Sequence, residues 1–194
     1  MSENNEVKLY KTIYADPPWY QRGAGAVKRG ADKYYPLMKE DKILELMQEV
    51  LKDKVAQNAH MYMWVANNHL PEALRIIEAL GFTYITNLVW VKKSYGLGRY
   101  FRGRHELCLF ATKGSGFSVR KDTNSISSLI GNDFVEKRKH SQKPDEMYEL
   151  IEKRSHGPYL EMFARNVRDG WDHFGNDPSL NNEHLVEDPE VGEE

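Results

Sequence analysis

The sequence contains a single cysteine and no long apolar run. One thiol, Cys108, excludes an intramolecular disulfide and a cysteine-based zinc site, and its place in the apolar run 107–110 predicts a buried side chain. Residues 1–10 lack the basic and apolar regions of a signal peptide, and no apolar run approaches the length of a membrane span. We therefore expect an intracellular, cytoplasmic protein with no membrane role.

Charge is distributed unevenly along the chain. The 194 residues carry a formal net charge of −2, but residues 181–194 contain six acidic residues and no Lys or Arg, which leaves residues 1–180 at about +4. A mildly basic body suits a nucleic-acid partner better than the total charge does. The apolar content of 40% predicts one globular domain over residues 1–180, and the acidic segment 181–194 is predicted to be a disordered tail outside the fold.

Periodic apolar residues predict an alternation of strands and helices. Strands are expected at 10–15, 60–66, 84–91, 105–112 and 159–164, with a short extended piece at 171–176. Helices are expected at 37–51, at 71–80 before the C-cap Gly81, and from Pro144 toward Gly157. This order predicts an α/β fold with helices on both faces of a mostly parallel sheet. The helix-free connection between residues 91 and 105 predicts one antiparallel strand near the sheet edge.

The first expected strand runs directly into the turn Asp16-Pro17-Pro18-Trp19. Two consecutive prolines have a fixed φ and no N–H, so the backbone must leave the sheet here in a stiff direction. The turn therefore puts a carboxylate and an aromatic ring at the carboxyl end of a strand, where ligands bind in open α/β sheets. Taken alone, the tetrapeptide could also be a surface loop.

An Asp-Pro-Pro-aromatic turn resembles the catalytic motif of adenine-N6 methyltransferases, in particular the family of the mRNA adenosine methyltransferase catalytic subunit and its phage and bacterial relatives. Segments 140–144, 161–166 and 171–177 are similar to three further motifs of that family, in the order of its circularly permuted β class. The resemblance covers residues 10–178. It implies the Rossmann-like fold of a class I methyltransferase with S-adenosylmethionine as cofactor, and the absence of a G-x-G fingerprint from 161–166 agrees with a cofactor that has no phosphate.

The resemblance also implies residue roles. The carboxylate of Asp16 and the carbonyl of Pro17 would each accept an N6–H of adenine, Trp19 would stack on the base, and Lys143 would complete the base pocket. The implied catalytic residues are Asp16, Pro17, Pro18, Trp19 and Lys143. The implied cofactor-binding residues are Asp16, Phe163, Arg165, Asn166, Asn176 and Asp177. In isolation, Lys143 could be a solvated helix start, Arg165 a surface ion-pair partner, and Asn176-Asp177 a plain turn.

Two basic, glycine-containing loops are the candidates for phosphate binding, at residues 20–35 and 94–104. A base inside a duplex cannot reach a site of this kind, so the substrate would be single-stranded or have its target base flipped out. The expected nucleic-acid-binding residues are Arg22, Lys28, Arg29, Arg99, Arg102 and Arg104.

The leading hypothesis is a DNA adenine-N6 methyltransferase of phage or bacterial type that uses S-adenosylmethionine. RNA is the alternative substrate. A second alternative is an inactive nucleic-acid-binding partner subunit, although such subunits lose the carboxylate that Asp16 supplies here. Methylation of a glutamine side chain is chemically akin, but those enzymes generally carry Asn at this position. Either a homodimer or a complex with a paralogous subunit fits the resemblance.

Overall fold

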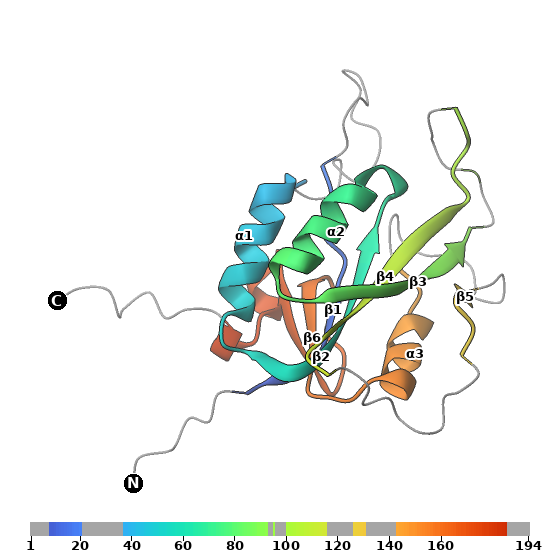
Figure 1. Cartoon of the computed structure of the whole chain (residues 1–194). Coiled ribbons are helices and arrows are strands. Elements are labelled where there is room, and N and C mark those ends of the chain that lie inside the picture. The colour runs from blue at the N-terminus through green and yellow to red at the C-terminus, as the bar shows by residue number, and fades with distance from the viewer. Residues whose placement is uncertain are drawn as a thin grey trace, which may run out of the picture.

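A seven-stranded sheet forms the centre of the protein, in the order β5-β3-β4-β2-β1-β6-β7 (Figure 1). The structure is a computed structural model, and it describes residues 8–20, 37–92, 95, 100–115, 126–130 and 143–185. The strands are β1 (Tyr10–Ala15), β2 (Val55–Val65), β3 (Thr83–Val91), β4 (His105–Lys113), β5 (Leu129–Ile130), β6 (Tyr159–Ala164) and β7 (Trp171–Gly175).

The strand directions match the predicted mostly parallel sheet. β1 runs parallel to β2 and β6, β6 to β7, and β3 to β5, whereas β4 runs antiparallel to both β2 and β3. A connection without a helix joins neighbouring antiparallel strands readily, and this is why β3 and β4 pair along almost their whole length. β4 lies two places in from the edge, because β3 and the two-residue β5 lie outside it. β5 is too short to leave a periodic pattern in the sequence.

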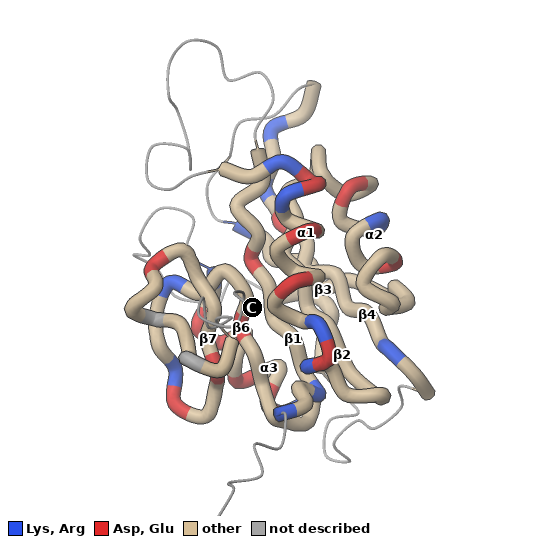
Figure 2. The backbone as a smooth tube through the Cα atoms, turned by 90° about the vertical axis from the view of Figure 1, so that its left-hand side faces the viewer, with Lys and Arg blue, Asp and Glu red and all other residues tan. Residues whose placement is uncertain are grey.

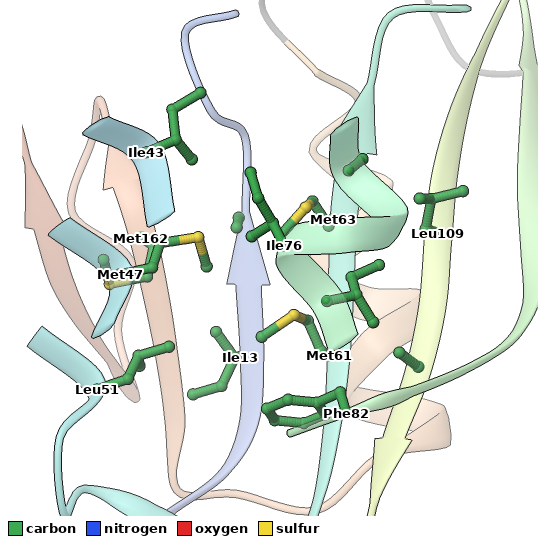
Figure 3. Close-up of a cluster of buried hydrophobic side chains, with 14 of the residues drawn as sticks. Ile13, Ile43, Met47, Leu51, Met61, Met63, Ile76, Phe82, Leu109 and Met162 are labelled. Atoms are coloured by element: carbon green, nitrogen blue, oxygen red, sulfur yellow. The ribbon is translucent and has the colours of Figure 1, made fainter. Parts of the chain in front are cut away.

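Helices cover both faces of the sheet, because successive side chains of a strand point to opposite sides. Helices α1 (Glu40–Leu51) and α2 (Leu70–Ala79) lie side by side over one face, and α3 (Glu146–Arg154) covers the other (Figure 1). The first layer is a fully buried apolar cluster that includes Ile13, Ile43, Met47, Met61, Met63 and Ile76 (Figure 3). The second layer contains Tyr14, Tyr62, Trp64, Met147 and Ile151, together with Cys108, which is buried as predicted.

Two helices begin later than the sequence pattern predicts. α1 begins at Glu40 rather than at residue 37, because Met38 pairs with the Asp-Pro-Pro-Trp turn: its amide donates to the Pro18 carbonyl (2.8 Å), and its carbonyl accepts from the amide of Tyr20 (3.0 Å). α3 begins at Glu146, and the carbonyl of Pro144 accepts a bond from the amide of Met147 (3.1 Å). The predicted C-cap glycine after α2 is confirmed, since Gly81 has a φ of 77°.

The ordered chain extends past the predicted domain boundary at residue 180. The short helices η3 (Pro178–Leu180) and η4 (Glu183–Leu185) follow β7, which lies at the sheet edge. The side-chain oxygens of Asn181 and Asn182 accept bonds from the amides of Gly175 and His173, both at 2.7 Å. These amides face outward from an edge strand, so the two asparagines satisfy donors that no other strand of the described residues pairs.

A polar contact also ties this segment to the amino end of β1. His184 Nε2 lies 2.6 Å from the hydroxyl of Tyr10 and 3.2 Å from Asp172 Oδ2, and Leu185 is buried in the first apolar layer. Residues 181–185 therefore belong to the fold, contrary to the sequence expectation, while 186–194 lie outside the described residues. Among the helices of the described part of the chain, none is both long and apolar enough to cross a membrane.

Candidate active site

The turn that follows β1 places Asp16 at the carboxyl edge of the sheet. Ala15, the last residue of β1, lies between Met63 of β2 and Met162 of β6. Because Pro17 and Pro18 have no N–H, the strand cannot continue, and the amide of Trp19 bonds back to the Pro17 carbonyl at 2.9 Å. That carbonyl has a second lone pair, so it keeps the capacity to accept another hydrogen bond.

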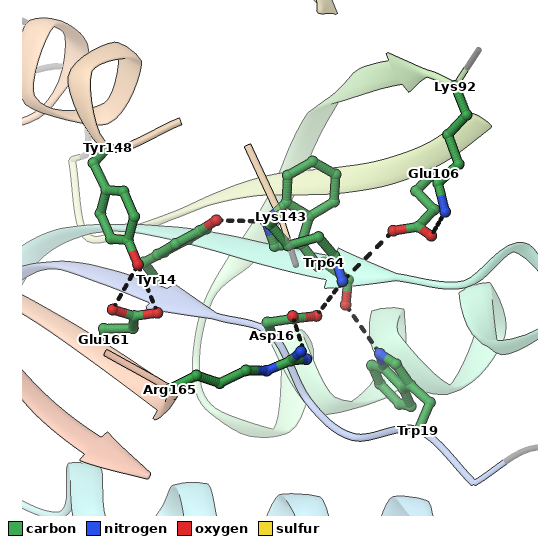
Figure 4. A network of polar contacts seen from close by, with 10 residues as sticks. All are labelled: Tyr14, Asp16, Trp19, Trp64, Lys92, Glu106, Lys143, Tyr148, Glu161 and Arg165. Carbon is green, nitrogen blue, oxygen red and sulfur yellow. Dashed lines mark hydrogen bonds and ion pairs between the residues drawn. The ribbon is translucent and has the colours of Figure 1, made fainter. Parts of the chain in front are cut away.

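Two cations hold the carboxylate of Asp16. Lys143 Nζ lies 2.7 Å from Oδ1, and Arg165 Nη2 lies 3.0 Å from Oδ2 (Figure 4). The three residues come from the end of β1, the segment before α3 and the loop after β6. The structure therefore brings together the predicted catalytic carboxylate, the predicted base-pocket lysine and the predicted cofactor-side arginine, and this pairing makes burial of the charges tolerable.

Sequence reasoning missed one acidic member of this cluster, Glu106. Its Oε2 lies 3.5 Å from Lys143 Nζ, and its Oε1 forms an ion pair with Lys92. Burial alone would raise the pKa of Glu106, but Lys143 and Lys92 outweigh it and hold that pKa below its ordinary value. Burial would likewise lower the pKa of Lys143, and the carboxylates of Asp16 and Glu106 raise it instead. The cluster is thus an alternating chain of charges, Asp16, Lys143, Glu106 and Lys92.

Trp19 anchors the turn, and its ring is buried. Its Nε1 donates to the carbonyl of Trp64 at 3.0 Å, and its ring stacks on His69 with centroids 5.4 Å apart and an interplanar angle of 16°. The side chain is only 8% exposed. His69, from the short helix η2 (Asn67–His69), covers the ring, and the stacking of Trp19 on the substrate base stays a prediction. The Nε2 atom of buried His69 has no hydrogen-bond partner among the described residues.

The cofactor side of the site begins at a backbone irregularity at the end of β6. Phe163 has a φ of 64°, where the pairing of β6 with β7 shifts register between Met162 and Ala164. A bulky residue in this region costs on the order of 1–3 kcal/mol, and such strain clusters at functional sites. Gly175 fits the irregularity, since a Cβ atom there would lie 2.1 Å from the Ala164 carbonyl oxygen.

The remaining predicted cofactor residues lie exposed after the same two strands. Asn166 follows β6, and Asn176 and Asp177 follow β7. Asp177 Oδ1 accepts from the amide (3.0 Å) and hydroxyl (2.7 Å) of Ser179, and these bonds lower the pKa of Asp177. Asp177 thus also caps a turn, which agrees with the alternative interpretation of Asn176-Asp177 as a plain turn.

A second buried acid lies beside the cluster. Glu161 of β6 accepts bonds from the hydroxyl of Tyr148 at 3.0 and 2.9 Å (Figure 4). Burial raises the pKa of Glu161 to about 7; the Tyr148 bonds oppose this rise and the charge of Asp16 adds to it. The neighbouring Tyr14 hydroxyl accepts from Trp64 Nε1 at 2.7 Å. The sequence offers a signal for Glu161, a carboxylate inside an otherwise apolar strand.

Two of the predicted nucleic-acid-binding residues can be placed. Arg102 and Arg104 are exposed in the connection between β3 and β4, and the guanidinium of Arg104 lies 4.9 Å from the ring centroid of Tyr95. Arg22, Lys28, Arg29 and Arg99 lie outside the described residues.

Comparison with known proteins identifies a family whose sequence pattern spans the strands and the site residues described above. The sequence profile of the MT-A70 family matches residues 10–177. The chain belongs to the MT-A70 family. This is a family of N6-adenine methyltransferases that act on nucleic acid, depend on S-adenosylmethionine and have the class I methyltransferase fold. The resemblance expected from the sequence is therefore confirmed.

The chain is similar to proteins from bacteria and from eukaryotes. It is 27% identical to the type II methyltransferase M.MunI of Mycoplasma sp over 87% of this chain and 77% of the relative. It is also 27% identical to the human N(6)-adenosine-methyltransferase catalytic subunit METTL3, over 94% of this chain but 30% of the relative. A putative N(6)-adenosine-methyltransferase of Medicago truncatula is 29% identical over 86% of this chain and 26% of the relative.

The described residues fit the cofactor of the family. Carboxylate and amide side chains lie after three adjacent strands, β1, β6 and β7, and can accept bonds from the hydroxyls of a ribose or from an amino group. The strained end of β6 and the bare backbone of Gly175 lie among them.

Proposed function

We propose that this chain transfers a methyl group from S-adenosylmethionine to the N6 amino group of adenine in DNA, on a base that is single-stranded or flipped out. The observation that carries the proposal is the carboxylate of Asp16, set at the carboxyl edge of the sheet between Lys143 and Arg165. The cofactor supplies, when bound, a sulfonium-activated methyl group. The chain itself must position a weak amine nucleophile and stabilise the charge that develops on it.

Asp16 and Pro17 are the acceptors for the two N6 hydrogens. One Asp16 oxygen is held by Lys143, whose side chain is 15% exposed, and the other by Arg165, whose side chain is 33% exposed. The more exposed pair is the weaker one, because water screens it. The substrate amino group therefore replaces Arg165 at Oδ2, while Lys143 stays on Oδ1 and fixes the carboxylate. With its second acceptor at the Pro17 carbonyl, the nitrogen is turned so that its lone pair faces the methyl group.

Lys143 and Glu106 set the charge balance around that acceptor. Lys143 bridges the two carboxylates, so its charge is shared and does not fully neutralise Asp16. The Asp16 carboxylate thereby keeps part of its negative charge beside the amine, where positive charge develops in the transition state. We assign to Glu106 a positioning role through Lys143, and to Asn176 and Asp177 the binding of the cofactor ribose.

The similarity to the bacterial type II methyltransferase, over 77% of its length, favours DNA. RNA is the second candidate, favoured by the equal identity to METTL3, of which the chain spans 30%. Two features argue against other roles for the site. The carboxylate that an inactive partner subunit would lack is present and paired, and an aspartate stands where glutamine methyltransferases generally carry asparagine.

Methyl-labelled cofactor tests the proposal directly. The protein is incubated with single-stranded DNA, duplex DNA, RNA and a mixture of proteins, and the products are digested to nucleosides and amino acids. We expect the wild type to place label in N6-methyldeoxyadenosine. The Asp16→Asn control should give no label above background. Label confined to N6-methyladenosine would transfer the assignment to RNA. Label in a glutamine side chain, or none in any arm by a protein that binds the cofactor, would refute the proposal.

A further inference from the structure

Three aromatic side chains stand out from the connection between β3 and β4. Tyr95 is 63% exposed, Phe101 is 85% exposed and Tyr100 is fully exposed. Large rings of this kind are usually buried, as Tyr14 and Trp64 are here, because burial of their apolar area is strongly favourable. Tyr100 also has a φ of 60°, which is rare for a bulky residue. Exposed rings next to one another on strained backbone indicate a binding surface.

The charge around these rings has one sign. The sequence from 92 to 104 contains five Lys or Arg residues and no Asp or Glu, whereas both signs are mixed along α1 and α2 (Figure 2). The guanidinium of Arg104 lies over the Tyr95 ring and donates to the Lys92 carbonyl at 3.3 and 3.4 Å, so it is held in place. We call Tyr95, Tyr100, Phe101, Arg102 and Arg104 the aromatic–arginine strip. A second copy of the chain would repel this surface at a symmetric contact, because like charges would meet.

The strip lies at the same edge of the sheet as Asp16. β3 points in the direction of β1 and β2, so the connection after Val91 starts at their carboxyl ends. The stem of the connection is closed by a bond from the Lys92 amide to the Arg104 carbonyl at 2.7 Å. Lys92 pairs with Glu106, which contacts Lys143, which contacts Asp16 (Figure 4). The stem of the connection that carries the rings is thus linked to the proposed catalytic carboxylate through three successive ion pairs.

We infer that the aromatic–arginine strip binds single-stranded nucleic acid by stacking its rings on the bases that flank the target adenine. Planar rings next to arginines suit a polyanion whose flat groups are unpaired, and stacking of this type tolerates any base. In a duplex the flanking bases are already stacked on one another, so the strip favours a single strand over a duplex. The inference rests on the proposed function for the identity of the target, but the strip's own binding is measurable without methyl transfer.

The experiment compares the wild type with the double variant Tyr100→Ala/Phe101→Ala. Fluorescence anisotropy gives the Kd for a labelled oligonucleotide as single-stranded DNA, single-stranded RNA and duplex DNA, and calorimetry gives the Kd for the cofactor. Loss of one stacked base weakens binding by about tenfold or more, so the double variant should lose about 100-fold for single strands and much less for the duplex. The DNA and RNA arms distinguish the two sources of single strand. Cofactor affinity should stay unchanged.

Two further variants separate stacking from charge. Tyr100→Phe/Phe101→Tyr keeps both rings and should bind single strands like the wild type. Arg102→Ala should lower the slope of log Kd against log salt by about 1, while removal of the uncharged rings leaves the slope unchanged. Tyr84→Ala is the control: this exposed ring lies at the other end of β3, roughly 23 Å from Val91 at about 3.3 Å per residue.

The outcomes separate this inference from the proposed function. An unchanged single-strand Kd in the double variant overturns the inference, and so does an equal loss for single strand and duplex. If the wild type methylates no nucleic acid but the double variant loses single-strand binding, the inference about the strip holds and the proposed function fails. If the wild type methylates DNA and the double variant has the same KM, the function stands and the inference fails.

Discussion

Replacement of Glu161 by glutamine should change how the stability of the protein depends on pH. The side chain is buried, and its pKa is raised from 4.5 to about 7, mainly by burial. This difference corresponds to roughly 3 kcal/mol of unfolding free energy. The folded protein keeps the proton on Glu161 up to about pH 7, whereas the unfolded chain releases it near pH 4.5. The free energy of unfolding therefore falls as pH rises between these values, and the loss is complete above pH 7.

Glutamine has nearly the same shape and does not titrate, and its amide oxygen still accepts from Tyr148. The unfolding free energy of Glu161→Gln minus that of the wild type should therefore grow by about 3 kcal/mol from pH 4.5 to 8 and then level off. Urea titrations at four pH values in this range measure it, and the melting temperatures should diverge by roughly 6–12 °C. Glu149→Gln, an exposed carboxylate of α3, controls for the loss of one negative charge. Parallel pH profiles for the wild type and Glu161→Gln would refute the reasoning.

Changes at four places in the chain probe the site and the end of the chain. Asp16→Ala should abolish methyl transfer, while calorimetry should show cofactor affinity close to that of the wild type; wild-type turnover would contradict the assignment. Asn176→Ala and Asp177→Ala should each weaken cofactor binding about threefold to tenfold by loss of a hydrogen bond, and unchanged affinity in both would remove them from the site. His69→Ala should lower kcat and reduce the unfolding free energy by roughly 1–3 kcal/mol, because Trp19 loses its stacking partner, and His69→Phe should restore the stability; an unchanged kcat would limit His69 to packing. Deletion of residues 186–194, which removes five acidic residues, should tighten DNA binding at low salt and less so at high salt, and equal low-salt affinities would show that this segment does not compete with phosphate.

The sequence was most informative where a local signal and the tertiary structure agree. β6 has the predicted bounds, 159–164, because a run of apolar residues follows Pro158 and the strand is buried on both sides. The start of α1 was predicted three residues too early, because Leu37 and Met38 continue its apolar pattern but Met38 is taken by the turn after Pro18. No local rule reveals that pairing, since the two segments meet only when the chain folds.

Asp16, Lys143 and Arg165 could be placed from the sequence together with the family resemblance, and their mutual contacts could not. Arg165 follows a parallel strand, so its place at the carboxyl edge is predictable from topology. Its contact with Asp16, 149 residues away, depends on how close the two side chains lie in the folded state. The burial of Trp19 could not be predicted for a related reason, because it depends on His69, which comes from another segment.

Glu106 shows how the direction of one strand decides which residues reach the site. In a parallel sheet, functional side chains are sought after the ends of strands, and Glu106 lies near the beginning of β4. Because β4 runs antiparallel, its beginning lies beside the end of β3, with Glu106 opposite Trp90. The helix-free connection before β4 predicts this antiparallel direction, and the direction decides which residues of β4 lie near Asp16. The edge that holds Asp16 also receives the first residues of β4 and the described residues of the connection before them. An acid and an exposed aromatic loop thereby reach the site from the wrong end of a strand, and a search restricted to strand ends would pass over both.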